Sequence, residues 1–314
     1  MRRLALISLT LFLFATPLAH SDMDTTRATL REHVLRLINR DRALYKLPPV
    51  QLDPQASAIG DDYCRTQIAN GTTGHYTTDG VPPYARYSFA GGNDAVSENA
   101  AAWSATYNFS DRALYEMAGR SQDAMMAEMP PADGHKRTML DPHATHVGIG
   151  LAWEGGEFRL VQEFIRRYVD WTRRLPRSAR VDQTVMFAGA PLPGVAIEGI
   201  TVHHEPLPSP IAATTASAIS NYSLPDKRRE YTPRFRAQGI SLARRGDFSV
   251  RGDGSFSFIV PFTDGPGLYT VVVWVKKDGQ RTAFPASNVS IRVEDVVRAS
   301  ARAAGRAEAR PTLK

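Results

Sequence analysis

Three side chains of this 314-residue chain have types and positions that could do chemistry: His75, Glu98 and His135. Both histidines lie in glycine-containing segments, which begin or end regular elements and leave side chains facing clefts. Neutral imidazole and carboxylate are ligands that zinc accepts while a water keeps the fourth position open. His75, His135 and one glutamate would therefore suffice to bind zinc or another divalent cation.

The same groups have other interpretations. Their spacing matches no compact metal motif such as H-E-x-x-H, and buried polar groups in any fold must be hydrogen-bonded, so a structural polar cluster is the alternative to metal binding. Hydrolysis would need Glu98 or Glu128 as a base for a metal-bound water, or Ser97 with a histidine. The chain has no G-x-S-x-G sequence, and the catalytic residues stay unassigned.

The elements that must position these residues show two periods. Apolar residues recur at helical spacing near residues 30–42, 56–68 and 111–128. From His146 the period changes to two, and Gly155-Gly156 predicts the turn of a hairpin. Helices beside a small sheet form a layered α+β domain.

Five parts of the sequence, taken together, match the motif pattern of a known family. They are Leu37-Ile38-Asn39-Arg40 with Leu47-Pro48-Pro49-Val50, His75 with Asp79-Gly80 and Arg86, Ser97-Glu98-Asn99-Ala100, Gly134-His135-Lys136-Arg137, and Val147-Gly148-Ile149-Gly150. In their order, residues 28–168 resemble the CAP superfamily of cysteine-rich secretory, antigen 5 and pathogenesis-related proteins, in its cysteine-poor bacterial form. The chain departs from the pattern at Met125, where the family has tryptophan, and at Thr138, where it has asparagine.

The resemblance implies a three-layer α-β-α sandwich with a central cleft. It places His75, Glu98, Glu128 and His135 in this cleft, with Glu116 as the competitor of Glu128. Members of the family look like secreted binding and signalling proteins, several of them associated with sterols or lipids. The predicted function is therefore a binding module for a lipid or cell-envelope ligand, with divalent metal on His75, His135 and Glu98. The alternative is a metal-assisted hydrolase or peptidase that uses the same cleft.

A second domain follows the first, which we predict over residues 28–170. An arginine- and proline-containing stretch at 171–180 predicts a linker, and short apolar runs between turn signals predict an all-β immunoglobulin-like sandwich over 181–296. Such an accessory domain would bind a surface polymer or another protein. Residues 204–236, rich in proline, serine and threonine, are expected to form a long loop or irregular edge.

The two ends of the chain have their own signals. Two arginines, an apolar run at 4–18 and small residues at 19 and 21 predict a signal peptide over 1–21, hence a secreted or periplasmic protein without a membrane span after cleavage. The basic tail at 297–314 is expected to be disordered. Because the formal charge of +6 resides in these ends, the body is near neutral, which argues against nucleic acid. The single cysteine, Cys64, excludes an internal disulfide.

Overall fold

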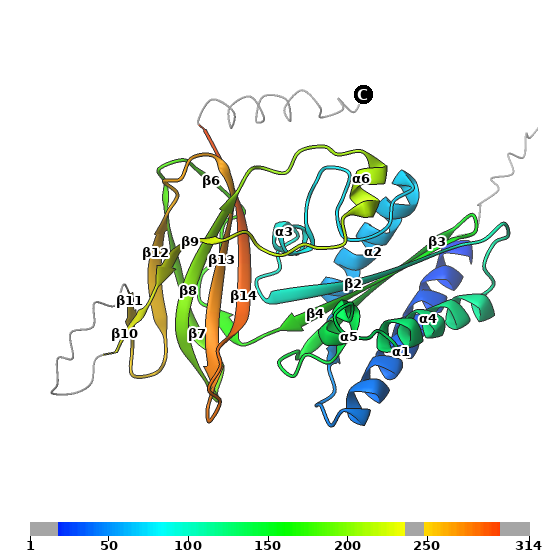
Figure 1. Ribbon diagram of the computed structural model, residues 1–314, viewed down its shortest axis with the longest axis horizontal. Helices are drawn as coiled ribbons and strands as arrows, with labels where there is room; N and C mark the ends of the chain where they lie inside the picture. The colour runs from blue at the N-terminus through cyan, green and yellow to red at the C-terminus, as the bar shows by residue number, and fades with distance from the viewer. Residues whose placement is uncertain (1–17, 236–247, 296–314) are drawn as a thin grey trace, which may run out of the picture.

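The computed structural model describes residues 18–235 and 248–295, which form two modules lying side by side (Figure 1). Most of the predicted signal peptide and all of the basic tail lie outside these ranges. Within them, no helix combines the length and apolar character needed to cross a membrane.

The first module has three layers. Its sheet has the strand order β1-β3-β4-β2, so β2 is an edge strand. Alternate strand residues pack on one face against α1 and α4, and the intervening residues pack on the other face against α2 and α3. The predicted α-β-α sandwich is confirmed. Its elements are α1 (Leu18–Leu44), β1 (Gln51–Leu52), α2 (Pro54–Asn70), α3 (Pro83–Phe89), β2 (Ala95–Ser104), α4 (Asp111–Met126), α5 (Gly134–Met139), β3 (His146–Glu154) and β4 (Glu157–Arg166).

Helix α2 is fixed at both ends and along its length. The Asp53 carboxylate accepts a hydrogen bond from the Ala56 amide at 2.8 Å and caps the first turn. A Cβ on Gly60 would lie 2.8 Å from the Cα of Gly150, so only glycine lets the helix lie this close to β3. The helix ends at Gly71, which has a φ of 61°. The loop that carries the first histidine therefore starts from a fixed point.

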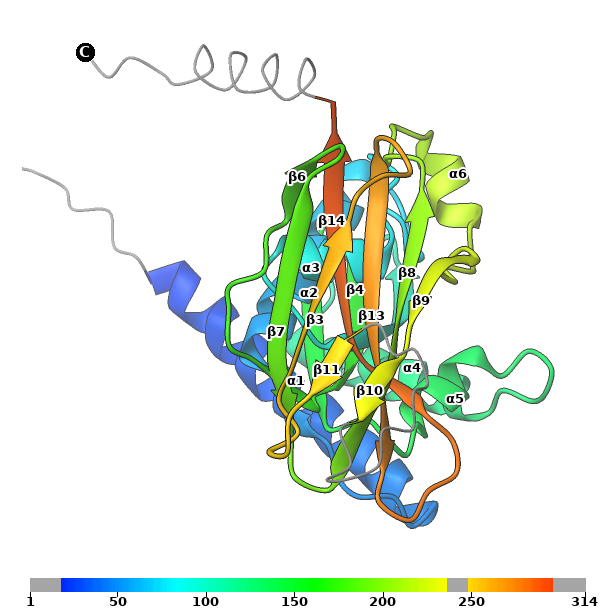
Figure 2. The same cartoon turned by 90° about the vertical axis from the view of Figure 1, so that its left-hand side faces the viewer.

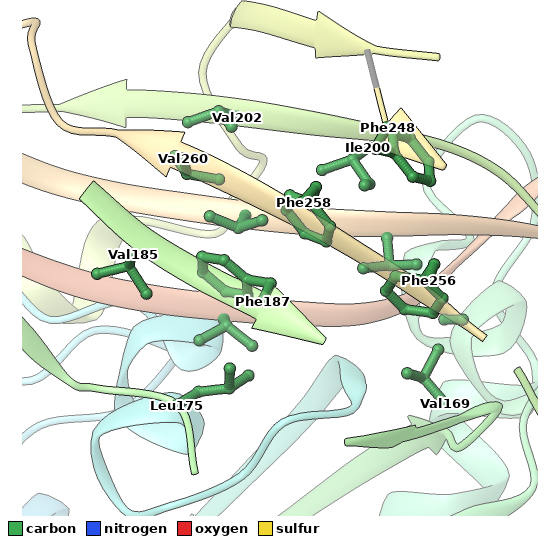
Figure 3. Packing of buried hydrophobic residues seen from close by; sticks show 14 of the residues in the cluster. Val169, Leu175, Val185, Phe187, Ile200, Val202, Phe248, Phe256, Phe258 and Val260 are labelled. Atoms are coloured by element: carbon green, nitrogen blue, oxygen red, sulfur yellow. The ribbon is translucent and has the colours of Figure 1, made fainter. Parts of the chain in front are cut away.

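The second module is a sandwich of two five-stranded sheets, with strand orders β10-β11-β12-β7-β5 and β6-β14-β13-β8-β9. One hydrophobic core fills the space between them (Figure 3), in which the rings of Phe187 and Phe258 stack with centroids 5.0 Å apart. The elements are β5 (Val169–Trp171), β6 (Ser178–Arg180), β7 (Thr184–Pro191), β8 (Val195–Glu205), α6 (Ala213–Ala218), β9 (Lys227–Tyr231), β10 (Pro233–Phe235), β11 (Phe248–Val250), β12 (Phe256–Pro261), β13 (Gly267–Lys277) and β14 (Phe284–Glu294).

A tyrosine at the start of β13 confirms the immunoglobulin-like character of this sandwich. The Tyr269 hydroxyl donates to the Gly265 carbonyl at 3.0 Å and accepts from the Asp264 amide at 2.8 Å. A tyrosine bonded back to the preceding corner at this position is a feature of immunoglobulin-like sandwiches. In the second of these sheets, β6 pairs in parallel with β14. The pairs β14–β13, β13–β8 and β8–β9 are antiparallel.

The structure differs from the linker predicted at 171–180. Residue 171 ends β5 and residues 178–180 form β6, which are edge strands of the two sheets. Arg177 also donates to the side chain of Asn93 in the first module at 2.6 Å. Strands of three residues are too short to show an alternating apolar pattern, and this explains why the sequence indicated only a connection.

The two modules share a buried polar contact. The Ser290 amide of β14 donates to the Ser88 hydroxyl of α3 at 3.0 Å, and the Val96 amide of β2 donates to the Asn288 side chain at 2.9 Å. Ser88 and Asn288 are buried. These two hydrogen bonds join α3 and the edge strand β2 of the first module to β14 of the sandwich.

Candidate functional site

The first histidine of the predicted set pairs with the first glutamate. His75 lies in the loop after α2, and Glu98 lies on β2. The Nδ1 atom of His75 is 2.9 Å from Oε1 of Glu98, and the two residues are only 7% and 2% exposed. This pair is buried beneath the surface of the module rather than open to solvent.

A single guanidinium completes this buried cluster. Arg86 of α3 forms an ion pair with Glu98, donates to the His75 carbonyl at 3.1 Å, and lies 3.6 Å from Oε1 of Glu163 on β4. Its guanidinium carbon is also 3.6 Å from the ring centroid of Tyr63. Among the described residues, neither oxygen of Glu163 has a hydrogen-bond partner. Burial raises the pKa of Glu163 to about 8.

The second histidine pairs with the second glutamate. Glu128, just after α4, contacts Nδ1 of His135 and accepts from the His135 amide at 2.9 Å. Their side chains are 23% and 35% exposed, so this pair is the accessible one. The competitor Glu116 instead pairs with Arg120 on the surface of α4. Glu128 is thus the glutamate that contacts His135.

The two pairs are not joined into one set. Successive residues of a strand point to opposite faces: Glu98 faces His75, whereas the next residue, Asn99, donates to the His135 carbonyl at 3.1 Å. Across residues 18–235 and 248–295, no group of three or more histidine, cysteine or acidic side chains is placed to hold a metal ion. The structure therefore places the four predicted residues in two pairs, His75 with Glu98 and His135 with Glu128.

The donor set of the buried pair does not fit a divalent cation. The Glu98 carboxylate already contacts the His75 ring with one oxygen and the Arg86 guanidinium with the other. A metal here would compete with a fixed positive charge for the same carboxylate. The arrangement instead matches the alternative derived from the sequence, a hydrogen-bonded polar cluster.

A residue that the sequence did not indicate completes the site. The hydroxyl of Tyr222, from the segment between β8 and β9, donates to the Glu98 carbonyl at 2.8 Å and accepts from the Glu98 amide at 2.7 Å. Its ring lies 4.6 Å from the His75 ring, centroid to centroid. Burial raises the pKa of the Tyr222 phenol, so it keeps its proton. Tyr222 is 124 residues from Glu98 in the chain, and no spacing signal links them.

A separate apolar pocket of about 690 Å³ opens on the same module. It lies between the start of α1, the end of α2 and the β3–β4 turn. Arg27 and Arg65 contribute positive charge and Glu154 contributes negative charge, while the apolar surface includes Ile68 and Trp153. The Nε atom of Arg27 is buried without a hydrogen-bond partner among the described residues. The pocket thus combines an apolar wall with two guanidinium groups.

Comparison with known proteins identifies the first module. Residues 35–164 match the family described as CAP, the cysteine-rich secretory protein family. Among solved structures, an extracellular protein containing an SCP domain from Bacillus anthracis str. Ames is similar at 18% identity and a TM-score of 0.33, over 43% of this chain and 40% of that one. No curated protein matches the chain. The family match and the motifs together show that residues 35–164 of this chain are a CAP domain.

Proposed function

We propose that the protein is exported and that its CAP domain binds a lipid of the cell envelope, an amphiphile with an acyl chain and an anionic head group. The observation that carries this proposal is the pocket of about 690 Å³ with its apolar wall and two arginines. Its volume lies within the roughly 300–1,000 Å³ of small-molecule sites. Each methylene group removed from water contributes about 0.8 kcal/mol.

The lining of the pocket has two arginines and one acidic residue, Glu154, a balance that favours an anionic head group. Arg27 pairs with Asp24 at 2.8 Å, but its Nε atom is left without a partner in the described part of the chain. Arg65 is half exposed and, within the described part of the chain, pairs with Asp62, three residues earlier on α2. Exposed ion pairs of this kind contribute little to stability, so a carboxylate or phosphate can exchange for the aspartate at small cost.

Exposed apolar residues extend the pocket towards solvent. Met23, which lines the pocket, is 45% exposed. Tyr107 is 64% exposed, and its ring contacts the ring of Phe109, which also lines the pocket. Exposed apolar surface next to a pocket is typical of ligand and membrane contact sites. An acyl chain entering from a membrane surface would meet apolar side chains first.

The geometry supports hydrolysis less well. His75 and Glu98 are buried and bonded to each other, and the described residues place no serine, threonine or cysteine hydroxyl or thiol in a hydrogen bond with His75 or His135. Cys64 is fully buried, and burial raises the pKa of its thiol well above the ordinary value, which removes the thiolate. Ligand binding in the separate apolar pocket is therefore the function that we propose.

Calorimetric titration with hexadecanoate tests the proposal. Ala69→Trp places a large ring at an exposed position of the pocket wall, and Arg65→Glu reverses one charge. Ala43→Trp, at an exposed alanine near the end of α1, and Arg120→Glu, which also disrupts a helical surface ion pair, are the matched controls. Both pocket variants should weaken binding about tenfold or more, and both controls should bind as the wild type does. The proposal would be contradicted if hexadecanoate bound all four variants with the same affinity. It would also be contradicted if hexadecanoate bound neither the wild type nor any variant.

A further inference from the structure

One segment of the sandwich leaves its own module and lies on the CAP domain. Residues 206–226 depart from the end of β8, reach α6 beside the CAP helices, and return to β9 (Figures 1 and 2). The Glu205 carboxylate, at the start of the segment, accepts a hydrogen bond from the Tyr84 hydroxyl of α3 at 2.6 Å. A direct turn between antiparallel neighbours such as β8 and β9 needs only a few residues. The connection is far longer than the sheet requires.

The segment is held by the loop that carries His75. The Thr73 amide donates to the Ser217 hydroxyl at 3.1 Å, and the Ile211 amide donates to the Thr78 carbonyl at 2.8 Å. Ala216 of α6 is fully buried. A Cβ on Gly74 would lie 3.6 Å from the Ser217 carbonyl oxygen, so the two backbones approach closely. The contacts are main-chain and small-residue contacts of the kind that a peptide makes in a groove.

The contacts of Tyr222 with the edge strand β2 resemble those of a bound ligand side chain. Strand β2 is an edge of its sheet, so its outward amides and carbonyls have no strand partner. The Tyr222 hydroxyl satisfies both outward groups of one residue, Glu98, and its ring packs on His75. A phenol placed between an edge-strand backbone and an imidazole is recognised by shape, by stacking and by two hydrogen bonds at once.

Joining the modules does not by itself account for the segment. Ser88 and Asn288 already form a buried contact between the modules that uses no residue of this segment. The segment has one charged residue, Asp226, in 21, and its large apolar residues are few. Most of its residues are half-buried or exposed; Ala216 is buried, and Tyr222 and Leu224 pack against the hydrophobic cluster that contains Val96 and Ile165.

We propose that the cleft beside β2 is a peptide-binding site that residues 206–226 occupy from within the chain. The ligand that fits from outside is an uncharged peptide segment with a tyrosine, whose hydroxyl replaces that of Tyr222 on Glu98. Because a tethered segment acts at an effective concentration in the millimolar range, an external peptide competes poorly until the segment is released. This site is distinct from the proposed lipid pocket.

The test uses the full-length protein and a fluorescent synthetic peptide with the sequence of residues 211–224. Tyr222→Ala removes the internal side chain, and Tyr45→Ala, at an exposed tyrosine of the CAP domain, is the control. Fluorescence anisotropy should show that the peptide binds Tyr222→Ala at least tenfold more tightly than it binds the wild type or the control. A peptide with alanine in place of its tyrosine should not bind. Hydrogen exchange of the Glu98 amide should slow when the peptide binds.

Each other outcome overturns the proposal. Equal binding to Tyr222→Ala and wild type, binding that survives loss of the peptide tyrosine, or binding without protection of Glu98 would show that the segment is only a structural connection. Should Tyr222→Ala fail to fold, Tyr222→Phe keeps the ring and loses both bonds to Glu98. Exchange at Glu98 must then rise about tenfold, the size expected for lost hydrogen bonds, and the peptide must reverse it. Hexadecanoate binding should be unchanged in either variant, so this proposal and the lipid proposal fail separately.

Discussion

Glu98 and Glu163 lie directly opposite each other on β2 and β4, and the single guanidinium of Arg86 serves both carboxylates. All three side chains are almost completely inaccessible. Glu98 contacts both the Arg86 guanidinium and the His75 ring, whereas neither oxygen of Glu163 has a hydrogen-bond partner among the described residues. Burial raises the pKa of Glu163 to about 8, so Glu163 is the acid that holds a proton near neutral pH.

Replacement of Glu163 by glutamine should change how stability depends on pH. The carboxyl pKa is raised from 4.5 in the reference state to about 8 in the folded state. Between these values the native protein holds a proton that the unfolded chain has released, so stability falls as pH rises through this window and is fully present below 4.5. Glu163→Gln, which needs no proton, should gain stability over the wild type at pH 8.5 and gain little at pH 4.5.

Urea unfolding at both pH values measures this effect. The exposed Glu116→Gln provides the control, because its carboxylate lies on the surface of α4. Asp94 and Glu205 also have pKa values raised by burial, so the difference between wild type and variant is the informative quantity. A difference that is independent of pH would show that Glu163 is ionised in the folded protein.

Removal of the Arg86 charge should destabilise the CAP domain strongly. Arg86→Met keeps much of the side-chain volume but leaves Glu98 buried without its cation. Breaking a buried ion pair by removing one partner typically costs about 3–5 kcal/mol. The double variant Arg86→Met/Glu98→Gln should recover part of this loss, and the surface change Arg120→Met should cost less than about 0.5 kcal/mol. If Arg86→Met cost no more unfolding free energy than the surface change Arg120→Met, water would have to reach the cluster.

The contact between the modules predicts that they unfold together. Asn288 accepts from the Val96 amide. The Ser88 hydroxyl of α3 donates to the Asn288 carbonyl and accepts from the Ser290 amide, both on β14. Asn288→Ala leaves a buried amide unsatisfied and should cost about 1–3 kcal/mol. Calorimetry should show one transition for the wild type. Two separate transitions in the wild type, with Asn288→Ala affecting neither, would show that each module is stable alone.

The sequence predicted the CAP layers because α2, β3 and the hairpin carry local signals. Asp53-Pro54 starts α2, Gly71 ends it, and Gly155-Gly156 turns the hairpin. The departure at Met125 did not affect this prediction, since its side chain is buried in the same core that the helices share. Periodicity and turns predicted helices beside a small sheet, and the resemblance to the CAP family implied the three layers.

The composition of the site could not be predicted in the same way. Both faces of the sheet are covered, so Glu163 lies in a strand without a clean alternation of polar and apolar residues. Tyr222 reaches Glu98 from the other module. Glu98 and Asn99 are adjacent on β2 and so face opposite layers, which is why Glu98 contacts His75 and Asn99 contacts the His135 carbonyl. The cleft of four residues stays a prediction.

A crystal structure of the full-length protein with hexadecanoate tests the proposed lipid binding most directly. We predict electron density for the acyl chain against Ile68, Phe109 and Trp153, with the carboxylate within hydrogen-bonding distance of Arg27 or Arg65. The same experiment with Ala69→Trp should show no density there. Density for the fatty acid at any other place on the protein, or an empty pocket at a saturating concentration, would contradict the account.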